Sequence, residues 1–202
     1  MTDSKKTDSK NKCDITDCDV TDIDIQWAHN IKRGCVKQIM RKYKYKKNDK
    51  KIKDTVEYNK CILFINILYE LIDKCEKEGI LFIPDHTCCG TCGHAEAPDV
   101  KELKESEEMG YGPYDTYMFF HAQTTDNILE QLMTDTHVNF WMSHGGFEDD
   151  INEPGKYMYD KIVGKFNDME CTIKYENERT NFELIISLHE EIWKHIPILN
   201  YE

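Results

Sequence analysis

The chain has 202 residues, of which 40% are hydrophobic and 32% charged, and its formal net charge is −12. It contains no run of eighteen apolar residues, which argues against a membrane-spanning helix, and its first residues lack the apolar core of a secretion signal. Nine cysteines are present, an odd number. We therefore expect a cytoplasmic protein with free or metal-bound thiols and no membrane partner, rather than a disulfide scaffold.

Charge is unevenly distributed along the chain. Residues 32–53 hold eleven Lys or Arg against the single acid Asp49, a net charge of +10 that leaves −22 on the remaining chain. The acidic remainder argues against a nucleic-acid coat, and only two tyrosines and two arginines accompany the lysines. We expect either a solvated, lysine-rich connection or a contact surface for an anionic partner, with nucleic acid the less favoured partner.

Two helices are predicted before residue 80. Apolar residues recur every three or four positions across 23–42 and again across 55–78, as in amphipathic helices, and Gly79 is typical of the position just past a helix end. Residues 43–54 are predicted as a basic loop between them. Three cysteines on the apolar faces are expected to be core packing residues: Cys35, Cys61 and Cys75.

Beyond Gly79 the pattern changes to short apolar or aromatic runs, which are typical of strands. A loop is predicted over 85–115, and helices are predicted to begin at Thr125-Asp126 and at Pro154. The predicted strands are 80–83, 117–121, 138–142, 170–175 and 182–188, the last two joined as a hairpin by the polar turn 176–181.

This order of elements predicts an α/β fold: two N-terminal helices, then a mostly parallel sheet of about five strands with a C-terminal hairpin. Residues 1–20 are too polar to bury much surface, and we expect a disordered tail. A single domain is predicted over 21–202, with a basic loop at 43–54 and a Cys/His loop at 85–96.

Three cysteines and two histidines fall within nine residues of the predicted loop, in the run His86-Thr-Cys-Cys-Gly-Thr-Cys-Gly-His94. The Cys89-Gly-Thr-Cys92 pair suits two ligands of a tetrahedral zinc ion. It suits equally a redox dithiol with Cys89 as nucleophile and Cys92 as resolving thiol, or a constrained loop without chemistry. Because adjacent thiols seldom ligate one ion, we expect either Cys88 or Cys89 to be a packing residue.

Further polar residues end the other predicted strands. His121 and Gln123 follow the second strand, and Ser143 and His144 follow the third. If these strands are parallel, their carboxyl ends meet the cysteines at one sheet edge, where open α/β sheets bind ligands. We predict Cys89 and Cys92 as metal ligands, with His94 and His121 the first choices to complete the site and Cys88 and His86 left open as alternatives. We also predict that three further residues at this edge contact a bound cofactor: Gln123, Ser143 and His144.

The same residues carry a resemblance to an uncharacterised domain family found mainly in bacteria. Its members have a Cys-Cys-x-Thr-Cys-Gly motif, here at residues 88–93, and a strand ending in His-x-Gln-x-Thr, here at 121–125. The similarity runs over roughly 55–190 and implies a shared α/β fold and a shared Cys/His/Gln edge, without an activity. The lysine-rich composition also resembles that of large-DNA-virus proteins, which implies an infected cell's cytoplasm or a virion.

The leading expectation is thus a zinc-binding protein. The alternatives are a thiol-disulfide oxidoreductase and a non-enzymatic interaction or virion-packaged protein whose contacts are made by residues 32–53.

Overall fold

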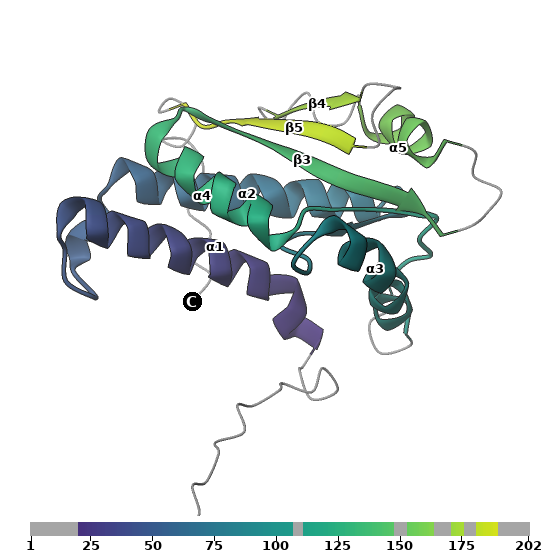
Figure 1. Cartoon of the computed structure of the whole chain (residues 1–202), viewed down its shortest axis with the longest axis horizontal. Helices are drawn as coiled ribbons and strands as arrows, with labels where there is room; N and C mark the ends of the chain where they lie inside the picture. Colours follow the sequence, from purple (N-terminus) through teal and green to yellow (C-terminus); the bar gives the residue numbers. More distant parts are fainter. Residues whose placement is uncertain (1–19, 107–110, 148–152, 164–170, 176–180, 190–202) are drawn as a thin grey trace, which may run out of the picture.

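The computed structural model describes residues 20–106, 111–147, 153–163, 171–175 and 181–189 (Figure 1). The predicted tail lies outside these residues except for Val20, as do most of the hairpin turn and the segment after residue 189. Among the described residues, no helix is both long enough and apolar enough to cross a bilayer.

The two N-terminal helices are confirmed and form an antiparallel pair. Helix α1 spans Val20–Tyr43 and α2 spans Val56–Glu76, with the short 3₁₀ turn η2 (Lys50–Ile52) between them. Thr55 caps α2 by accepting a hydrogen bond from the Tyr58 N–H. The three cysteines expected to pack in the core are fully buried, as their positions on the apolar helix faces predict: Cys35, Cys61 and Cys75.

Five strands form one sheet in the order β1-β2-β3-β5-β4. Their bounds are β1 Ile80–Ile83, β2 Thr116–Phe119, β3 His137–Gly146, β4 Cys171–Tyr175 and β5 Asn181–Ser187. Only β1 and β2 pair in parallel, and the other three pairings are antiparallel. The prediction of a mostly parallel sheet was therefore wrong, whereas the antiparallel β4–β5 pair agrees with the predicted hairpin.

Helices cover both faces of the sheet and create two apolar cores. Helices α1, α2, α4 (Ala122–Thr134) and α5 (Pro154–Ile162) contribute to the larger core, which contains Phe64, Met118 and Phe140. The other face of β1 and β2 packs against α3 (Gly90–Lys104), with Ala97 and Phe119 in a smaller core. Alternate residues of β2 thus point into different cores, as the two-residue period of a strand requires.

Helix α3 occupies about half of the segment 85–115 that we expected to be a loop, and that expectation was wrong there. Its buried positions are the small residues Gly93 and Ala97 together with Lys104, so the helix lacks the broad apolar stripe that identifies a helix in a sequence. Helix α4 was expected to begin at Thr125-Asp126, but it begins earlier, at Ala122. His121 is its N-cap, while the Thr125 hydroxyl donates to the Asp85 carboxylate (2.5 Å).

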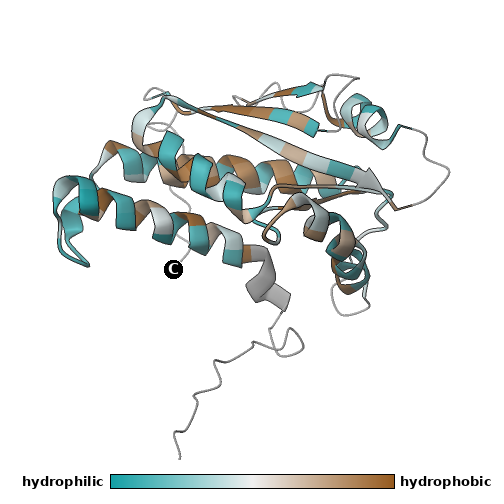
Figure 2. Ribbon diagram, in the orientation of Figure 1, coloured by the Kyte–Doolittle hydropathy of each residue, from teal (hydrophilic) through white to brown (hydrophobic). Residues whose placement is uncertain are grey.

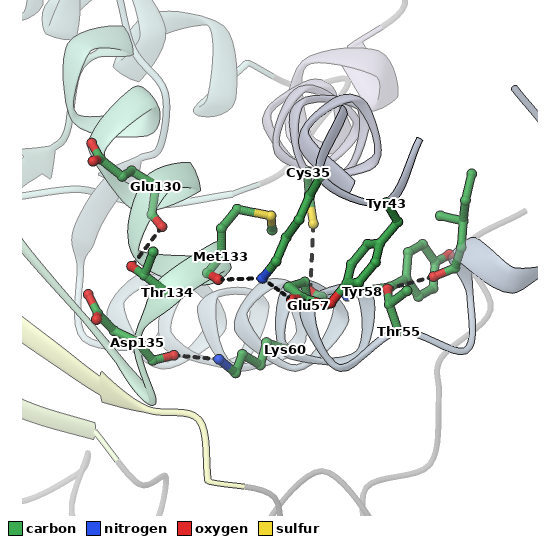
Figure 3. Close-up of polar contacts among 12 residues, drawn as sticks. Cys35, Tyr43, Thr55, Glu57, Tyr58, Lys60, Glu130, Met133, Thr134 and Asp135 are labelled. Atoms are coloured by element: carbon green, nitrogen blue, oxygen red, sulfur yellow. Dashed lines mark hydrogen bonds and ion pairs between the residues drawn. The ribbon is translucent and has the colours of Figure 1, made fainter. Parts of the chain in front are cut away.

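A group of polar contacts ties the ends of α1, α2 and α4 together (Figure 3). The buried Glu57 carboxylate accepts hydrogen bonds from Lys42 Nζ (2.6 Å) and from the Tyr43 hydroxyl (2.9 Å). Lys42 Nζ also donates to the Met133 carbonyl, and the ammonium group of Lys60 donates to the Asp135 carbonyl (2.6 Å). These contacts satisfy carbonyl groups at the C-terminus of α4.

Candidate functional site

The loop between β1 and α3 carries the cysteines and is fixed at several points. Asp85 and Thr87 both adopt positive φ angles, 53° and 55°. Between them, the His86 N–H donates to the Phe120 carbonyl (2.8 Å), and the Ala122 N–H donates to the Thr87 carbonyl (3.1 Å). The loop therefore follows the path of the β2–α4 junction, and its unusual backbone geometry is held by bonds to that junction.

The Asp85 carboxylate links this loop to two helices. One oxygen accepts from Asn30 Nδ2 of α1 (3.0 Å), and the other accepts from the Thr125 hydroxyl of α4 (2.5 Å). Each donor lies at least forty residues away in sequence. The position of the loop thus depends on the completed fold rather than on local sequence.

Helix α3 begins among the cysteines. Cys89 is its N-cap, with extended backbone angles, and its carbonyl accepts from the Gly93 N–H (3.0 Å) and from the Thr87 hydroxyl (3.1 Å). Gly93 lies against the Phe119 ring so closely that an added Cβ would come within 2.2 Å of it. A glycine is required at this position because the helix approaches β2 through its backbone.

Three thiols meet at this helix start. The sulfurs of Cys88, Cys89 and Cys92 all lie within 4.8 Å of one another, and Cys88 Sγ is 3.7 Å from Cys92 Sγ. Two sulfurs bound at about 2.3 Å to one tetrahedral ion lie about 3.8 Å apart. A disulfide would require about 2.0 Å, and all three cysteines are free. The spacing therefore matches ligands of a shared ion.

The electrostatics of the three thiols are unequal. The pKa of Cys89 lies below its ordinary value, first because the Cys92 backbone N–H in the first helical turn favours the thiolate, and then because the Cys92 and Cys88 side chains do so. The pKa of Cys92 is raised to about 11, first because its thiol is hydrogen-bonded to the Cys89 and Cys88 sulfurs, and then because negative charge on those neighbours disfavours a second thiolate. Of Cys89 and Cys92, Cys89 is therefore the thiol that loses its proton first.

Three imidazoles near this end of the sheet favour the neutral form. Burial lowers the pKa of His86, of His94 and, to about 4, of His144. The Nδ1 atom of His94 is 2.9 Å from the Tyr117 hydroxyl, and its ring meets the Phe119 ring edge to face. Neutral imidazoles have the protonation state that metal binding requires, but each of these rings is already packed against neighbouring groups.

The structure brings together only part of the predicted ligand set. Cys89 and Cys92 meet as expected, and Cys88 joins them. Cys88 is exposed, so of the two adjacent cysteines only the half-buried Cys89 fits the expected packing residue. Among the described residues, the close group includes neither His94 nor His121. His94 follows Cys92 by two residues, about 200° around the helix. Both histidines stay predictions as ligands.

Cys88 was only one of four candidates to complete the site, and the sequence could not single it out because the helix start was missed. With Cys89 as the N-cap, Cys92 lies in the first turn of α3, and its Sγ lies 3.7 Å from the Sγ of Cys88 just before the helix. The signal available in the sequence was the glycine pair around Cys92, which permits close approach of a helix to a sheet.

The three residues predicted to contact a cofactor lie in different surroundings. Ser143 is opposite Phe119 in the sheet register, and its hydroxyl is 3.9 Å from the Cβ position of Gly90. His144 points to the other face, where its ring packs against Tyr175 and Phe182. Gln123 is exposed in the first turn of α4. The predicted convergence relied on a parallel third strand. Ser143 reaches this edge instead because the antiparallel β3 is long.

A cavity of about 420 Å³ lies on the other side of the loop, among α1, α2 and α3. Trp27 and Tyr69 form part of its wall, with Asp85, His86 and Thr87 contributing from the loop. None of the three cysteines lines it. The thiol group is therefore a separate surface feature, and Cys88 is exposed to solvent.

The fold and the site define a mixed α/β protein whose five-stranded sheet supports a three-thiol group at the start of a helix. Over residues 67–176 the chain matches the domain of unknown function DUF6891, and because this is more than half of its length, the chain belongs to that family. The match includes the three cysteines, but α1 and the basic connection precede it. No curated protein matches the chain, and no solved structure does either.

Proposed function

We propose that this protein binds a thiophilic metal ion, zinc in the first instance, through Cys88, Cys89 and Cys92. The observation that carries the proposal is the 3.7 Å separation of two sulfurs within a group of three, which matches the sulfur separation of a tetrahedral thiolate site. The first turn of α3 supports it, because its N–H groups and dipole favour thiolates at this position.

Three protein thiolates leave one position of a tetrahedral ion for another ligand. Of the two predicted histidines, we propose His121, because it begins α4, and the Ala122 N–H donates to Thr87 beside the cysteines. The imidazole of His94 is bonded to Tyr117 instead. Replacing His121 with alanine is expected to weaken zinc binding about tenfold or more, and His94→Ala is expected to weaken it less.

The direct test is metal content, measured by elemental mass spectrometry on protein purified without chelator or affinity metal. We expect about one zinc per chain and protection of the three thiols from alkylation until chelator is added. Cys88→Ser and Cys92→Ser should each lower zinc affinity strongly, whereas Cys171→Ala, at a buried cysteine outside the group, serves as the matched control. Absence of metal after equilibration with zinc would exclude the proposal.

Zinc affinity should also depend on pH with a defined sign. Because the pKa of Cys92 is about 11 without metal, binding must release its proton at neutral pH. Affinity is therefore expected to rise about tenfold or more per pH unit between pH 6 and 8, since at least one thiol loses a proton on binding. Competition titrations with a chromophoric chelator at several pH values measure this slope.

A second candidate function is thiol-disulfide exchange, favoured by the unequal pKa values of Cys89 and Cys92. The Cys89 thiolate would attack one sulfur of a substrate disulfide and displace the other as a thiolate, forming a mixed disulfide. Cys92, after losing its proton to solvent, would then attack Cys89 Sγ and release the reduced substrate. An external dithiol would reduce the resulting Cys89–Cys92 disulfide.

The Cys92→Ser variant distinguishes metal binding from thiol-disulfide exchange. Under exchange chemistry this variant accumulates a mixed disulfide with oxidised glutathione, detectable as added mass, while Cys89→Ser does not. Under the metal proposal both variants lose zinc, and neither supports turnover of a disulfide substrate. Both functions require reduced thiols and hence a reducing compartment such as the cytoplasm. Packaging in a virion stays a prediction.

A further inference from the structure

The connection between α1 and α2 carries the largest concentration of positive charge on the chain. We call residues 37–56 the basic tip. All nine of its cations are exposed, and eight of them form no ion pair with another described residue: Lys37, Arg41, Lys44, Lys46, Lys47, Lys50, Lys51 and Lys53. Lys42 is the exception, because it is paired with the buried Glu57. The charges of the tip are thus available to a partner.

The basic tip lies at one end of the molecule's long axis, away from α3 (Figure 1). Figure 2 shows the same turn as a hydrophilic end of a helical pair whose inner faces are hydrophobic. The tip carries a net charge of +7 and the rest of the chain −19, so an anionic partner is attracted to the tip and repelled elsewhere. Contact is therefore restricted to this end of the molecule.

The tip also exposes apolar surface. Tyr43 is 41% exposed and Val56 is 50% exposed, and they are two of the four large hydrophobic side chains exposed in the part of the chain that the structure describes. Tyr43 is an amphipathic side chain whose hydroxyl is held by Glu57. Lysines beside exposed Tyr and Val side chains form a surface suited to the charged and partly apolar headgroup region of a bilayer.

The aromatic side chains of the basic tip are poorly placed to stack on the bases of a nucleic acid. The Tyr45 ring stacks on Tyr43 with centroids 5.5 Å apart, and the Lys42 ammonium lies 5.5 Å from the Tyr43 centroid. The Tyr43 ring is thus already engaged, and Arg41 is the sole arginine among the nine exposed cations. Nucleic-acid binding relies on free aromatic faces and on arginine forks, so these contacts favour lipid over nucleic acid.

We propose that the basic tip binds an anionic lipid surface peripherally, with Lys44, Lys46, Lys47 and Lys50 supplying the attraction and Val56 entering the headgroup region. The expectation of no membrane partner rested on the absence of a spanning segment, and peripheral binding needs none. The inference is independent of the thiol site, and the tip lies outside the range that matches the family.

The test is cosedimentation of the full chain with vesicles of phosphatidylcholine alone and of phosphatidylcholine mixed with phosphatidylserine. Binding is expected to the mixed vesicles only and to fall as salt is raised, since screening shortens the reach of the charges. A variant with Lys44→Gln, Lys46→Gln, Lys47→Gln and Lys50→Gln should lose at least about tenfold in partition coefficient. Val56→Ser should lose a smaller factor that does not depend on salt.

The matched control replaces four lysines elsewhere, Lys77, Lys101, Lys156 and Lys174, with glutamine. Both quadruple variants lower the formal charge by the same four units from −12, so only the location of the change differs. Equal loss in both would overturn the proposal, as would binding to phosphatidylcholine alone. Circular dichroism confirms that each variant is folded before it is scored.

The same variants distinguish lipid from two other anionic partners of the basic tip, a nucleic acid and an acidic polypeptide. Tip-dependent binding of a single-stranded oligonucleotide without vesicle binding would replace the lipid with nucleic acid. Tip-dependent binding of polyglutamate without vesicle binding would replace it with an acidic polypeptide. Each result would overturn the lipid assignment.

Discussion

The thiol group lies at the start of α3, the basic tip lies at one end of the long axis away from α3, and the two are built in different ways (Figure 1). At the thiol end, α3 approaches β2 through Gly93, and the cysteine loop is held by backbone hydrogen bonds to Phe120 and Ala122. At the basic end, long side chains such as Lys42 and Lys60 span the gaps between helices. Backbone contact fixes positions closely, whereas long side chains tolerate adjustment.

The difference corresponds to what each end is proposed to do. A metal site needs sulfurs placed to within a few tenths of an ångström, so it belongs where the backbone itself is packed. A surface that attracts lipid headgroups needs charge density and no fixed geometry. The comparison predicts that small changes at the thiol end have large effects, and that changes of similar size at the basic end have small ones.

The largest effect is expected for Gly93→Ala. The added methyl group would lie within 2.2 Å of Phe119, a fully buried ring, so the helix or the ring must shift. We expect a loss of about 2–3 kcal/mol in the free energy of unfolding, because the cost of overpacking exceeds the helix-propensity gain of about 1 kcal/mol. Urea denaturation measures the loss, and zinc titration should show weaker binding as α3 moves.

The matched control is Gly90→Ala in the same helical turn. Its Cβ would meet only the Ser143 hydroxyl, at an ordinary 3.9 Å, and we expect a change within about 0.5 kcal/mol. Similar losses for both glycines would show that the turn resists any side chain and that the contact with Phe119 is not the cause.

The next effect is acid sensitivity caused by His144. Both ring nitrogens are buried and lack a hydrogen-bond partner in the described structure, and burial lowers the pKa to about 4. The unfolded chain takes up a proton near pH 6.5, so the stability that the neutral ring confers is complete above that pH and is lost as pH falls toward 4. After allowance for partial exposure, this loss is on the order of 2 kcal/mol.

Replacing His144 with leucine tests this by removing the titrating group. The variant is expected to lose less stability than the parent protein between pH 7 and pH 4.5, by on the order of 2 kcal/mol in urea midpoints converted to free energy. His137→Gln, at an exposed position of the same strand, is the control and should keep the slope of the parent. An unchanged slope in His144→Leu would show that other groups cause the acid sensitivity.

The sequence was sufficient where structure depends on local pattern. The helix predicted over 23–42 is found at Val20–Tyr43, and the strand predicted over 80–83 is found at the same residues. Both have strong apolar periodicity or a bounded apolar run, and both are buried in the cores. Gly79 was also predicted correctly, since its φ of 73° lies in the region that favours glycine.

The sequence was insufficient where structure depends on distant partners. Helix α3 buries Gly93 and Ala97 against a strand more than twenty residues away, and small residues of this kind carry no periodic apolar signal. The direction of β3 is likewise set by its pairing with β2 and β5. The same limit applies to the site, because Cys88 joins Cys89 and Cys92 only once the helix is known to begin at Gly90.

A smaller effect is expected at the basic end from Glu57→Gln. Burial would raise the pKa of Glu57, but the hydrogen bonds from Lys42, its own backbone and Tyr43 outweigh it and hold the pKa below the usual value. The charged form therefore stabilises the fold above about pH 4.5, and this contribution is lost as pH falls. We expect a loss of about 1 kcal/mol at pH 7, since the half-exposed Lys42 returns to water.

Measuring zinc affinity shows whether the loss of stability in Glu57→Gln stays local or also affects the thiol group. Because the Glu57 side chain contacts Lys42 and Tyr43 and none of the three thiols, Glu57→Gln is expected to lower the urea midpoint while zinc affinity stays within about twofold of the parent value. A parallel loss of zinc binding would mean that the two ends are coupled through α1 and α2, and the contrast between them would fail.

The smallest effect is expected for Gly34→Ala in α1. The new Cβ would come within 2.5 Å of Leu129, but it meets the flexible end of a side chain rather than a ring. Rotation of Leu129 relieves the contact at modest cost, and alanine gains about 1 kcal/mol over glycine in a helix. We expect the two contributions to cancel to within about 0.5 kcal/mol in urea denaturation. A loss as large as that of Gly93→Ala would show that the α1–α4 contact is as rigid as the α3–β2 contact. Our expectation that side-chain contacts between α1 and α4 adjust to small changes in volume would then be wrong.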